Sequence, residues 1–467
     1  MTSDERPLCA MNDEERIRGA SQTFVLRSSF FVIFIIAIYL GIGTLYAVNT
    51  PAWQVPDEPA HYNYVRYIVE HRALPVLQPG DYDQAYLERI KAAKFPPSMS
   101  VDPIRYESWQ PPLYYVLAAP IYLATGGSLL ALRLFSVALG GSLIVVAFLI
   151  VRQVAPDSPA LALGAAAFVA FVPQHVAMMA GVNNDSLAEL LLALILWQTI
   201  NLKPQTSNFK WVALGVTLGL GLWTKSTVYI AAPLVAVAIW LAYRGQPASR
   251  KWTWLIRRGI LVFGPALSLG SLWWIRNITV YGWPDFLVSI RHTAVVVGQP
   301  TFAEWIAQYG WGYFLQHFVV VTFQSFWGQF GWMGVPMPPR YYVALGALSL
   351  VALVGCIWYS KIKYPMSNAP ESLSAPSLKF GSGYLIFWVI LTALVYVYYN
   401  TTFVQHQGRY LFPALIPIGL LFTVGLRQWT TLLPRAWRAV ALAAPFAALA
   451  ALDLIALFRM IVPALTR

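Results

Sequence analysis

The sequence predicts an all-α protein that crosses a membrane about eleven times. The chain has 467 residues, of which 58% are hydrophobic and only 11% are charged. Soluble proteins carry roughly 25% charged residues, so this composition excludes a soluble globular enzyme and a disordered chain. Apolar stretches follow one another through most of the sequence, and each approaches the roughly 20 residues that cross a bilayer as a helix.

The first expected span, Phe30 to Val48, contains no charged residue and follows a charged tail, 1–27. Because it has no small-residue cleavage site, we expect it to be a signal anchor. The other expected spans are residues 129–151, 160–180, 187–202, 211–224, 227–243, 259–275, 341–359, 383–399, 410–426 and 437–458. Glycines at 214–221 suit closely packed helices, although glycine is common in membrane helices generally. Residues 28–467 are expected to form a single transmembrane domain.

The short loops between the spans indicate the orientation. Basic residues gather in alternate loops: Arg152, Lys203, Lys210, Arg244, Arg250, Lys251, Arg257, Arg258, Lys361, Lys363, Lys379, Arg427, Arg435 and Arg438. Because positively charged loops remain in the cytoplasm, we expect loops 244–258 and 360–382 inside, with a cytoplasmic N-terminus and an external C-terminus. The long segments 49–128 and 276–340 are then external. The short, proline-interrupted stretch 111–124 is expected to lie at the outer membrane face.

The first external segment carries the sequence Pro-Asp-Glu-Pro-Ala-His at residues 56–61. Pro59 suits the first turn of a helix, and an amphipathic helical pattern follows it. Asp57 and Glu58 could simply cap this helix. However, carboxylates at a membrane boundary are costly and are usually retained for a function.

Three further polar sites occur where the chain enters or leaves an expected span on the same side. Asp185 precedes a span and could cap its helix. Arg409 lies in the sequence Gln-His-Gln-Gly-Arg-Tyr at 405–410 and could be an arginine at the membrane interface. Arg276 follows the seventh expected span.

Acids and arginines at one outer cavity suit a reaction on an anionic, lipid-linked substrate. A carboxylate can orient or deprotonate an acceptor hydroxyl, and guanidinium groups can bind a phosphate and stabilise it as a leaving group. No typical spacing of metal ligands is found in the sequence, although Asp57, Glu58 and Asp185 could share a divalent cation such as Mg or Mn.

Six short motifs together resemble membrane glycosyltransferases of the GT-C superfamily, which includes protein O-mannosyltransferases and the bacterial aminoarabinose transferase. The motifs are residues 56–62, 109–115, 183–185, 222–225, 275–277 and 407–410. The sequence is most similar to bacterial membrane proteins whose first loop reads Pro-Asp-Glu-Pro-Ala-His and whose late loop reads Gln-Gly-Arg-Tyr. Each motif is weak alone, but they occur in order along most of the chain.

The resemblance implies a GT-C-type bundle whose first external loop forms surface helices over a cavity. It also implies a polyprenyl-phosphate sugar as donor, Asp57 as the catalytic acid with Glu58 beside it, and Asp185 as a second acid. The expected substrate-binding residues are His61, Glu107, Lys225, Arg276, His406, Arg409 and Tyr410. Where the aminoarabinose transferase pattern has a lysine, this chain has Gln110. The phosphate contact is therefore expected from Arg276, Arg409 or Lys225.

We therefore expect an inverting glycosyltransferase at the outer face of the cytoplasmic membrane, with a lipid, glycan or protein acceptor. The net charge of +12 does not indicate nucleic acid as a partner, because the basic residues lie mostly in short loops. A transporter or lipid flippase is the main alternative, although the sequence lacks the visible repeats of transporters. A catalytically inactive envelope partner stays open. The aromatic residues of 301–333 suit an interface belt or a sugar-stacking surface.

Overall fold

The computed structural model describes residues 30–244, 251–363 and 376–466 and is almost entirely helical, as predicted. The expected cytoplasmic tail, 1–27, lies outside the described residues. The elements in chain order are the helix Phe30–Asn49, α2 (Glu58–His71), α3 (Gln84–Ala92), α4 (Leu113–Ala124), α5 (Leu129–Val154), α6 (Pro159–Phe171), α7 (Pro173–Met179), α8 (Asp185–Ile200), α9 (Asn208–Leu222), η1 (Ser226–Ile230), α10 (Ala231–Arg244), α11 (Lys251–Tyr281), α12 (Ser289–Val295), α13 (Phe302–Trp327), β1 (Gln329–Phe330), β2 (Val335–Pro336), α14 (Pro339–Lys363), α15 (Pro376–Tyr399), η4 (Gly408–Ala414), α16 (Leu415–Thr430), α17 (Arg435–Ala456), η5 (Leu457–Ile461) and α18 (Val462–Leu465).

Several of these helices can cross a membrane, which makes the chain a multi-pass membrane protein. Among the described residues, 7 helices are long and apolar enough to span a bilayer, and the bent pair of α6 and α7 would make 8. The predicted number of eleven is not confirmed. One reason is that the expected spans at 187–202 and 211–224 form helices of only 16 and 15 residues, α8 and α9.

The expected span at 160–180 is broken rather than continuous. Helices α6 and α7 meet at a bend of 63°. Pro173 begins α7, and Val172 before it is extended, because a proline ring disfavours helical geometry in the preceding residue. The bend turns α7 and its side chains Gln174 and Met178 into the interior at one end of the bundle.

The glycine pattern at 214–221 does mark a close helix contact. At Gly215 of α9, a Cβ atom would lie 2.2 Å from the carbonyl oxygen of Val262 in α11. Only a residue without a side chain allows the two backbones to approach this closely. The packing of α9 on α11 fixes the end of α9, where Lys225 follows.

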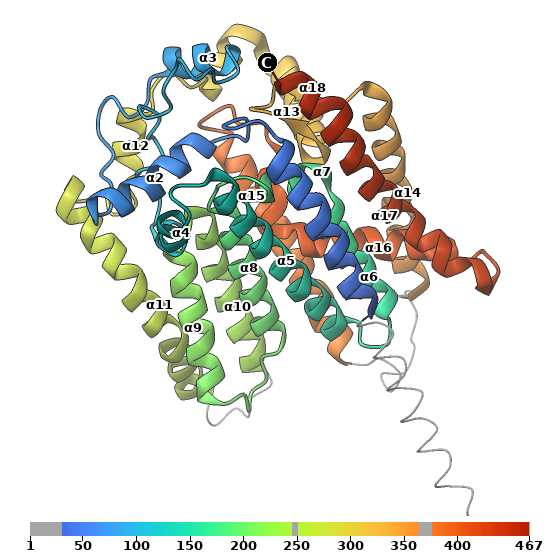
Figure 1. The fold of residues 1–467 in the computed structure, drawn as a ribbon. Helices are drawn as coiled ribbons and strands as arrows, with labels where there is room; N and C mark the ends of the chain where they lie inside the picture. The colour runs from blue at the N-terminus through green and yellow to red at the C-terminus, as the bar shows by residue number, and fades with distance from the viewer. Residues whose placement is uncertain (1–29, 245–250, 364–375, 467) are drawn as a thin grey trace, which may run out of the picture.

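The two long segments that we expected to be external, 49–128 and 276–340, bind each other at one end of the bundle. Figure 1 shows α2, α3 and α12 at this end, together with the C-terminus. Arg276 donates to the carbonyl of Pro75 over 2.6 Å, and Arg291 donates to the carbonyl of Leu77 over 3.1 Å. The segment after α13 forms a two-stranded antiparallel sheet, β1 with β2. These contacts create a folded cap over the helix ends.

The C-terminal residues lie on the same side as the first external segment. Lys94, just after α3, donates to the carbonyl oxygen of Thr466 over 2.8 Å. This arrangement agrees with a C-terminus and a segment 49–128 that share one side of the membrane. Which side is external remains a prediction from the charged loops, and residues 245–250 and 364–375 of those loops lie outside the described residues.

We predict that the cap faces the outside of the cell. Cys9 and Cys356 would first be replaced, and single cysteines introduced at the exposed Ser98 of the cap and the exposed Ser207 between α8 and α9. A membrane-impermeant maleimide should label Ser98→Cys in intact cells and Ser207→Cys only after permeabilisation. Labelling of Ser207→Cys alone in intact cells would reverse the orientation.

Candidate functional site

The first external segment places Asp57 at the start of α2 in an unusual backbone conformation. Asp57 is the residue before the first helical turn, with φ of 66°, in the left-handed region that non-glycine residues seldom adopt. Its side chain makes no capping bond to the helix. Pro59 occupies the first turn, as predicted. A simple helix cap therefore does not account for Asp57.

Glu58 points into the protein, where it binds Arg133 of α5. The carboxylate accepts two bonds from the Arg133 guanidinium, of 2.7 and 2.6 Å, and further bonds from the backbone N–H groups of Trp53 and Val182. The side chains of Glu58 and Arg133 are 0% and 3% exposed. Because its oxygens are fully engaged, this carboxylate orients the loop and the start of α2.

Asp57 points to the opposite side and accepts bonds on both of its oxygens. The hydroxyl of Tyr106 donates to Oδ1 over 2.7 Å, and Arg409 donates to Oδ2 over 3.0 Å. Burial by itself would raise the pKa of Asp57, but the charge of Arg409 and these hydrogen bonds hold it below its ordinary value. Asp57 is therefore a carboxylate at neutral pH.

Arg409 owes its position to the glycine before it. The backbone of Gly408 lies directly on α13, where a Cβ atom would come within 2.3 Å of the Thr322 carbonyl oxygen and 2.4 Å of the Phe326 nitrogen. The Gly408 N–H also donates to Ser325 Oγ over 2.7 Å. The sequence Gln-Gly-Arg-Tyr thus requires glycine at this position, because any side chain would push Arg409 away.

A second ion pair joins the end of α9 to the start of α8. Lys225, after α9, binds Asp185, the first residue of α8, with 2.7 Å between Nζ and Oδ1. Asn184 beside it donates to the carbonyl of Thr224 over 3.1 Å and lies 3.4 Å from Gln110 Oε1. These bonds tie the segment before α4 to the loops after α7 and α9.

Glu107 and His61 complete the site: His61 is buried, and Glu107 is half-buried with its Oε2 shielded from water. Burial and the negative charge of Asp57 raise the pKa of Glu107 to about 7, although Lys225 opposes this rise. Burial and the charge of Lys225 lower the pKa of His61 to about 3. The neutral imidazole of His61 lies 2.8 Å from the Tyr115 hydroxyl through Nδ1.

We call Asp57, Glu107, Asp185, Lys225 and Arg409 the charged cluster. They come from five separate parts of the chain and interact electrostatically with one another. Two carboxylates already have basic partners, and the other carboxylate, Glu107, has an oxygen without one among the described residues. Acidic and basic side chains that gather in this way are typical of a site that binds charged substrates.

The other expected substrate-binding residues lie at varying distances from the charged cluster. Tyr410 is adjacent, with the Arg409 guanidinium carbon 5.6 Å from its ring centre. Arg276 is engaged with the carbonyl of Pro75 instead. His406 packs against aromatic residues of α13, and its Nδ1 lies 2.7 Å from Nδ1 of His317 in that helix. The expected phosphate contact by Arg276, Arg409 or Lys225 stays a prediction, and of these three residues Arg409 and Lys225 lie among the acids of the site.

The three acids that could share a cation do not meet at one point. Asp57 binds Arg409, Glu58 binds Arg133, and Asp185 binds Lys225. Within the part of the chain that the structure describes, no group of three His, Cys, Asp or Glu side chains could hold a metal ion. The geometry gives the acids basic partners rather than a common cation.

One cavity has walls that include neighbours of the charged cluster, and another lies among the described helices. The first of these is small and partly open to solvent, and it lies between the first loop, α7 and the C-terminal turn. Its walls include Pro56, next to Asp57, and Met178, which contacts Arg409. It also includes Gln54, which is 3% exposed and whose Nε2 has no bonding partner in the described chain. This unpaired amide can bind a small polar group.

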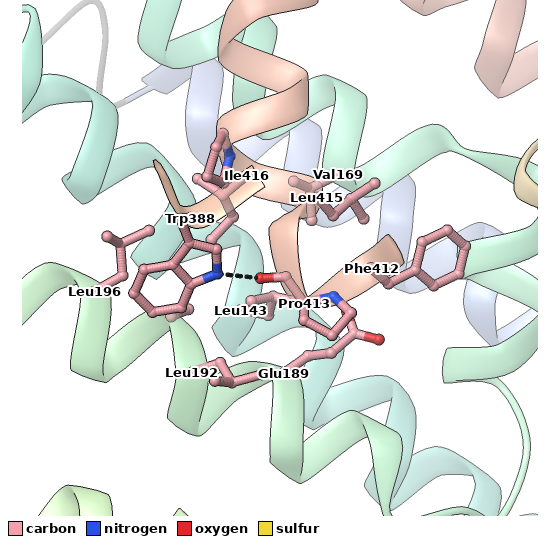
Figure 2. Close-up of a pocket in the computed structure, with 12 residues that line it drawn as sticks. Leu143, Val169, Glu189, Leu192, Leu196, Trp388, Phe412, Pro413, Leu415 and Ile416 are labelled. Carbon is pink, nitrogen blue, oxygen red and sulfur yellow. Dashed lines mark hydrogen bonds between the residues drawn. The ribbon is translucent and has the colours of Figure 1, made fainter. Parts of the chain in front are cut away.

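The other cavity lies deeper among the helices and contains no member of the charged cluster. Figure 2 shows it between Trp388, whose indole donates to the Pro413 carbonyl over 2.8 Å, and Glu189. Glu189 is bound by the buried His175 at 3.1 Å. This cavity is small and mostly apolar, and it belongs to the helix packing.

Sequence reasoning missed Arg133 and Tyr106, which hold the two acids of the first loop. Arg133 was an available signal, because a single arginine inside the expected span 129–151 must find a partner in the protein. Tyr106 gave no such signal, since tyrosines occur throughout this chain.

We predict that Arg133→Met destabilises the protein strongly, by roughly 3–5 kcal/mol, because Glu58 would remain buried and unpaired. The matched control is Arg66→Met, which breaks the exposed pair of Arg66 with Asp102 and should cost about 0–1 kcal/mol. Thermal unfolding of both variants in the same detergent is the measurement. The double variant Arg133→Met with Glu58→Gln should recover part of the loss. Equal melting temperatures for the two single variants would show that the buried pair does not hold the loop.

Comparison with known proteins finds one family model that matches part of the chain and several similar solved structures. Residues 109–269 match the family model of dolichyl-phosphate-mannose-protein mannosyltransferases, which covers Asp185 and Lys225 but not Asp57 or Arg409. No curated protein sequence matches the chain.

Solved structures that are similar include ArnT from Cupriavidus metallidurans bound to undecaprenyl phosphate, with 15% identity and a TM-score of 0.48. The apo state of that protein gives 13% and 0.49, and each comparison covers 94% of this chain and 74% of the other. The Archaeoglobus fulgidus oligosaccharyltransferase tethered to an acceptor peptide gives 13% identity and a TM-score of 0.45, over 93% of this chain and 55% of that one. The family match, in a multi-pass helical protein, confirms that the chain resembles membrane glycosyltransferases of the GT-C superfamily.

Proposed function

We propose that the protein transfers a sugar from a polyprenyl-phosphate donor to an acceptor hydroxyl at the charged cluster. The observation that carries this proposal is the contact of Asp57 with Arg409 at 3.0 Å, next to the contact of Lys225 with Asp185 at 2.7 Å. Glycosyl transfer from a lipid phosphate requires both kinds of group at one place: a carboxylate for the acceptor and cations for the leaving phosphate.

Arg409 and Lys225 are the residues we assign to the donor phosphate. Both side chains are largely shielded, at 13% and 14% exposed, so a phosphate would meet them with little competing water. Arg409 also has capacity for a further bond, because its Nε has no partner within the described residues. A guanidinium can hold two phosphate oxygens at once, which suits a group that gains charge as the sugar leaves.

Asp57 is the residue we assign to the acceptor. Its carboxylate can align the hydroxyl on the face of the sugar opposite the phosphate, which gives inversion at the anomeric carbon. Gln54, three residues before Asp57 in the chain, has a side-chain amide without a partner among the described residues, and this amide can donate to a hydroxyl. The description of the matching family as a mannosyltransferase that uses dolichyl phosphate supports the donor class.

A transporter or flippase remains the alternative from another class. The charged cluster lies at one end of the bundle, among helix ends and cap residues, whereas transport sites typically lie near the middle of the membrane. This position favours transfer chemistry at the membrane surface. We place the reaction at the outer face, in line with the predicted orientation.

Asp57→Asn should reduce turnover by at least about a hundredfold, because the amide keeps the shape but loses the charge that orients the acceptor and Arg409. Purified protein would be given a panel of polyprenyl-phosphate sugars, with mass spectrometry of the products. Donor affinity should change far less than turnover. Near-normal transfer by Asp57→Asn would remove this carboxylate from the reaction.

Arg409→Ala should weaken donor binding by about 10- to 100-fold, since a charge-assisted bond to phosphate contributes about 1.5–3 kcal/mol. Arg409→Lys should restore only part of the affinity, because lysine cannot make two parallel bonds. The matched control is Arg276→Ala, whose guanidinium is engaged with the Pro75 carbonyl. Equal donor affinities for Arg409→Ala and Arg276→Ala would contradict the assignment.

A further inference from the structure

Glu107 is the carboxylate of the charged cluster that has no basic residue in direct contact. Its Oε2 is shielded from water and has no hydrogen-bond partner in the described part of the chain. The Glu107 carboxylate nevertheless interacts electrostatically with Asp57, Lys225 and Asp185. A buried polar atom without a partner is costly, and in a native site it calls for a functional explanation.

The backbone around Glu107 is held firmly against the rest of the site. Asn63 of α2 donates to the carbonyls of Val101 and Ile104 over 2.7 and 2.9 Å. Tyr106, directly before Glu107, donates to Asp57, and the N–H of Gln110 donates to the Glu107 carbonyl over 3.0 Å. The free oxygen is therefore a property of the folded loop rather than of a loose side chain.

The other titratable groups of the site are poor proton acceptors. Both oxygens of Asp57 accept hydrogen bonds, and the charge of Arg409 lowers its affinity for a proton. Asp185 is likewise paired with Lys225. His61 is engaged through Nδ1 with Tyr115, and burial disfavours its protonated form.

We propose that Glu107 accepts the proton of the acceptor hydroxyl, while Asp57 positions that hydroxyl and Arg409. This proposal rests on the proposed glycosyl transfer and divides its acid–base work between two carboxylates. Neighbouring carboxyl groups with different environments commonly take such separate roles.

The step balances without a further reactant. The acceptor oxygen forms a bond to the anomeric carbon while the bond from that carbon to the phosphate oxygen breaks. The electron pair of the broken bond leaves with the lipid phosphate, next to Arg409 and Lys225. The hydroxyl proton passes to Oε2 of Glu107, which becomes a carboxylic acid and later releases the proton to water.

The environment of Glu107 suits this role at neutral pH. Burial and the charge of Asp57 raise its pKa to about 7, close to the pH at which a general base works best. A base must be deprotonated, so turnover should fall as the pH decreases below about 7. Since the folded protein favours neutral Glu107, this residue should reduce stability as the pH rises through about 7.

The experiment compares Glu107→Gln with the parent and with Glu88→Gln, a change at an exposed glutamate of the same external segment. Turnover and donor affinity would be measured from pH 5.5 to 8.5 with the polyprenyl-phosphate sugar that the parent accepts. Glu107→Gln should lower turnover by at least about a hundredfold, abolish the decrease in rate below about pH 7, and leave donor affinity within about threefold. Glu88→Gln should behave as the parent.

Thermal unfolding separates this role from a structural one. Glu107→Gln should be at least as stable as the parent at pH 8, because it removes a buried charge. If it fails to fold, Glu107→Asp provides the test: it should retain the acidic decrease in rate with lower turnover. Loss of that pH dependence in an active Glu107→Asp protein would contradict the proposal.

Two outcomes distinguish this inference from the proposed function. If the parent transfers sugar and Glu107→Gln keeps both its rate and its pH dependence, the assignment of Glu107 is overturned and the function stands. If the folded parent transfers no sugar from any polyprenyl-phosphate donor in the panel, the proposed function fails, and the assignment fails with it.

Discussion

The buried ion pair of Glu58 with Arg133 is the interaction on which the rest of the site depends. Besides Glu58, Arg133 binds the carbonyls of Ala47, Thr50 and Pro51, at the end of the first helix. The last carbonyls of a helix lack partners within it, and a cation is favourable there. One arginine thus ends the first membrane helix, reverses the chain and fixes the start of α2. Asp57 precedes Glu58 directly, so its direction is set by the same contact.

The charged cluster combines opposing charges in a way that prepares it for an anionic ligand. Each cation is already held by a carboxylate, which compensates for the cost of removing both charges from water. A phosphate that enters this site meets guanidinium and ammonium groups that need little reorganisation. The cost falls on Glu107, which is repelled by Asp57 and Asp185 and has no cation in direct contact.

The sequence allowed much of the fold and the main members of the site to be predicted, because polar motifs in an apolar chain stand out. Segments 49–128 and 276–340 were expected to share one side, and their mutual contacts place them together at one end of the bundle. The pairing of residues could not be predicted: Asp57 and Arg409 are 352 positions apart, and no periodicity connects them. Nothing in the sequence indicated that Arg276 would donate to the Pro75 carbonyl in the cap. Whether each residue performs its expected role stays a prediction.

At Gly408 no side chain separates the backbone before Arg409 from the backbone of α13. Side chains between two segments can accommodate small movements by changing rotamer, but the Gly408 backbone contacts the α13 backbone directly. A tilt or slide of α13 must therefore carry Arg409 with it and alter its distance to Asp57. The helix α13 exposes aromatic residues such as Trp311 and Tyr313. A molecule that binds to this surface and shifts α13 would therefore also change the position of Arg409 in the charged cluster.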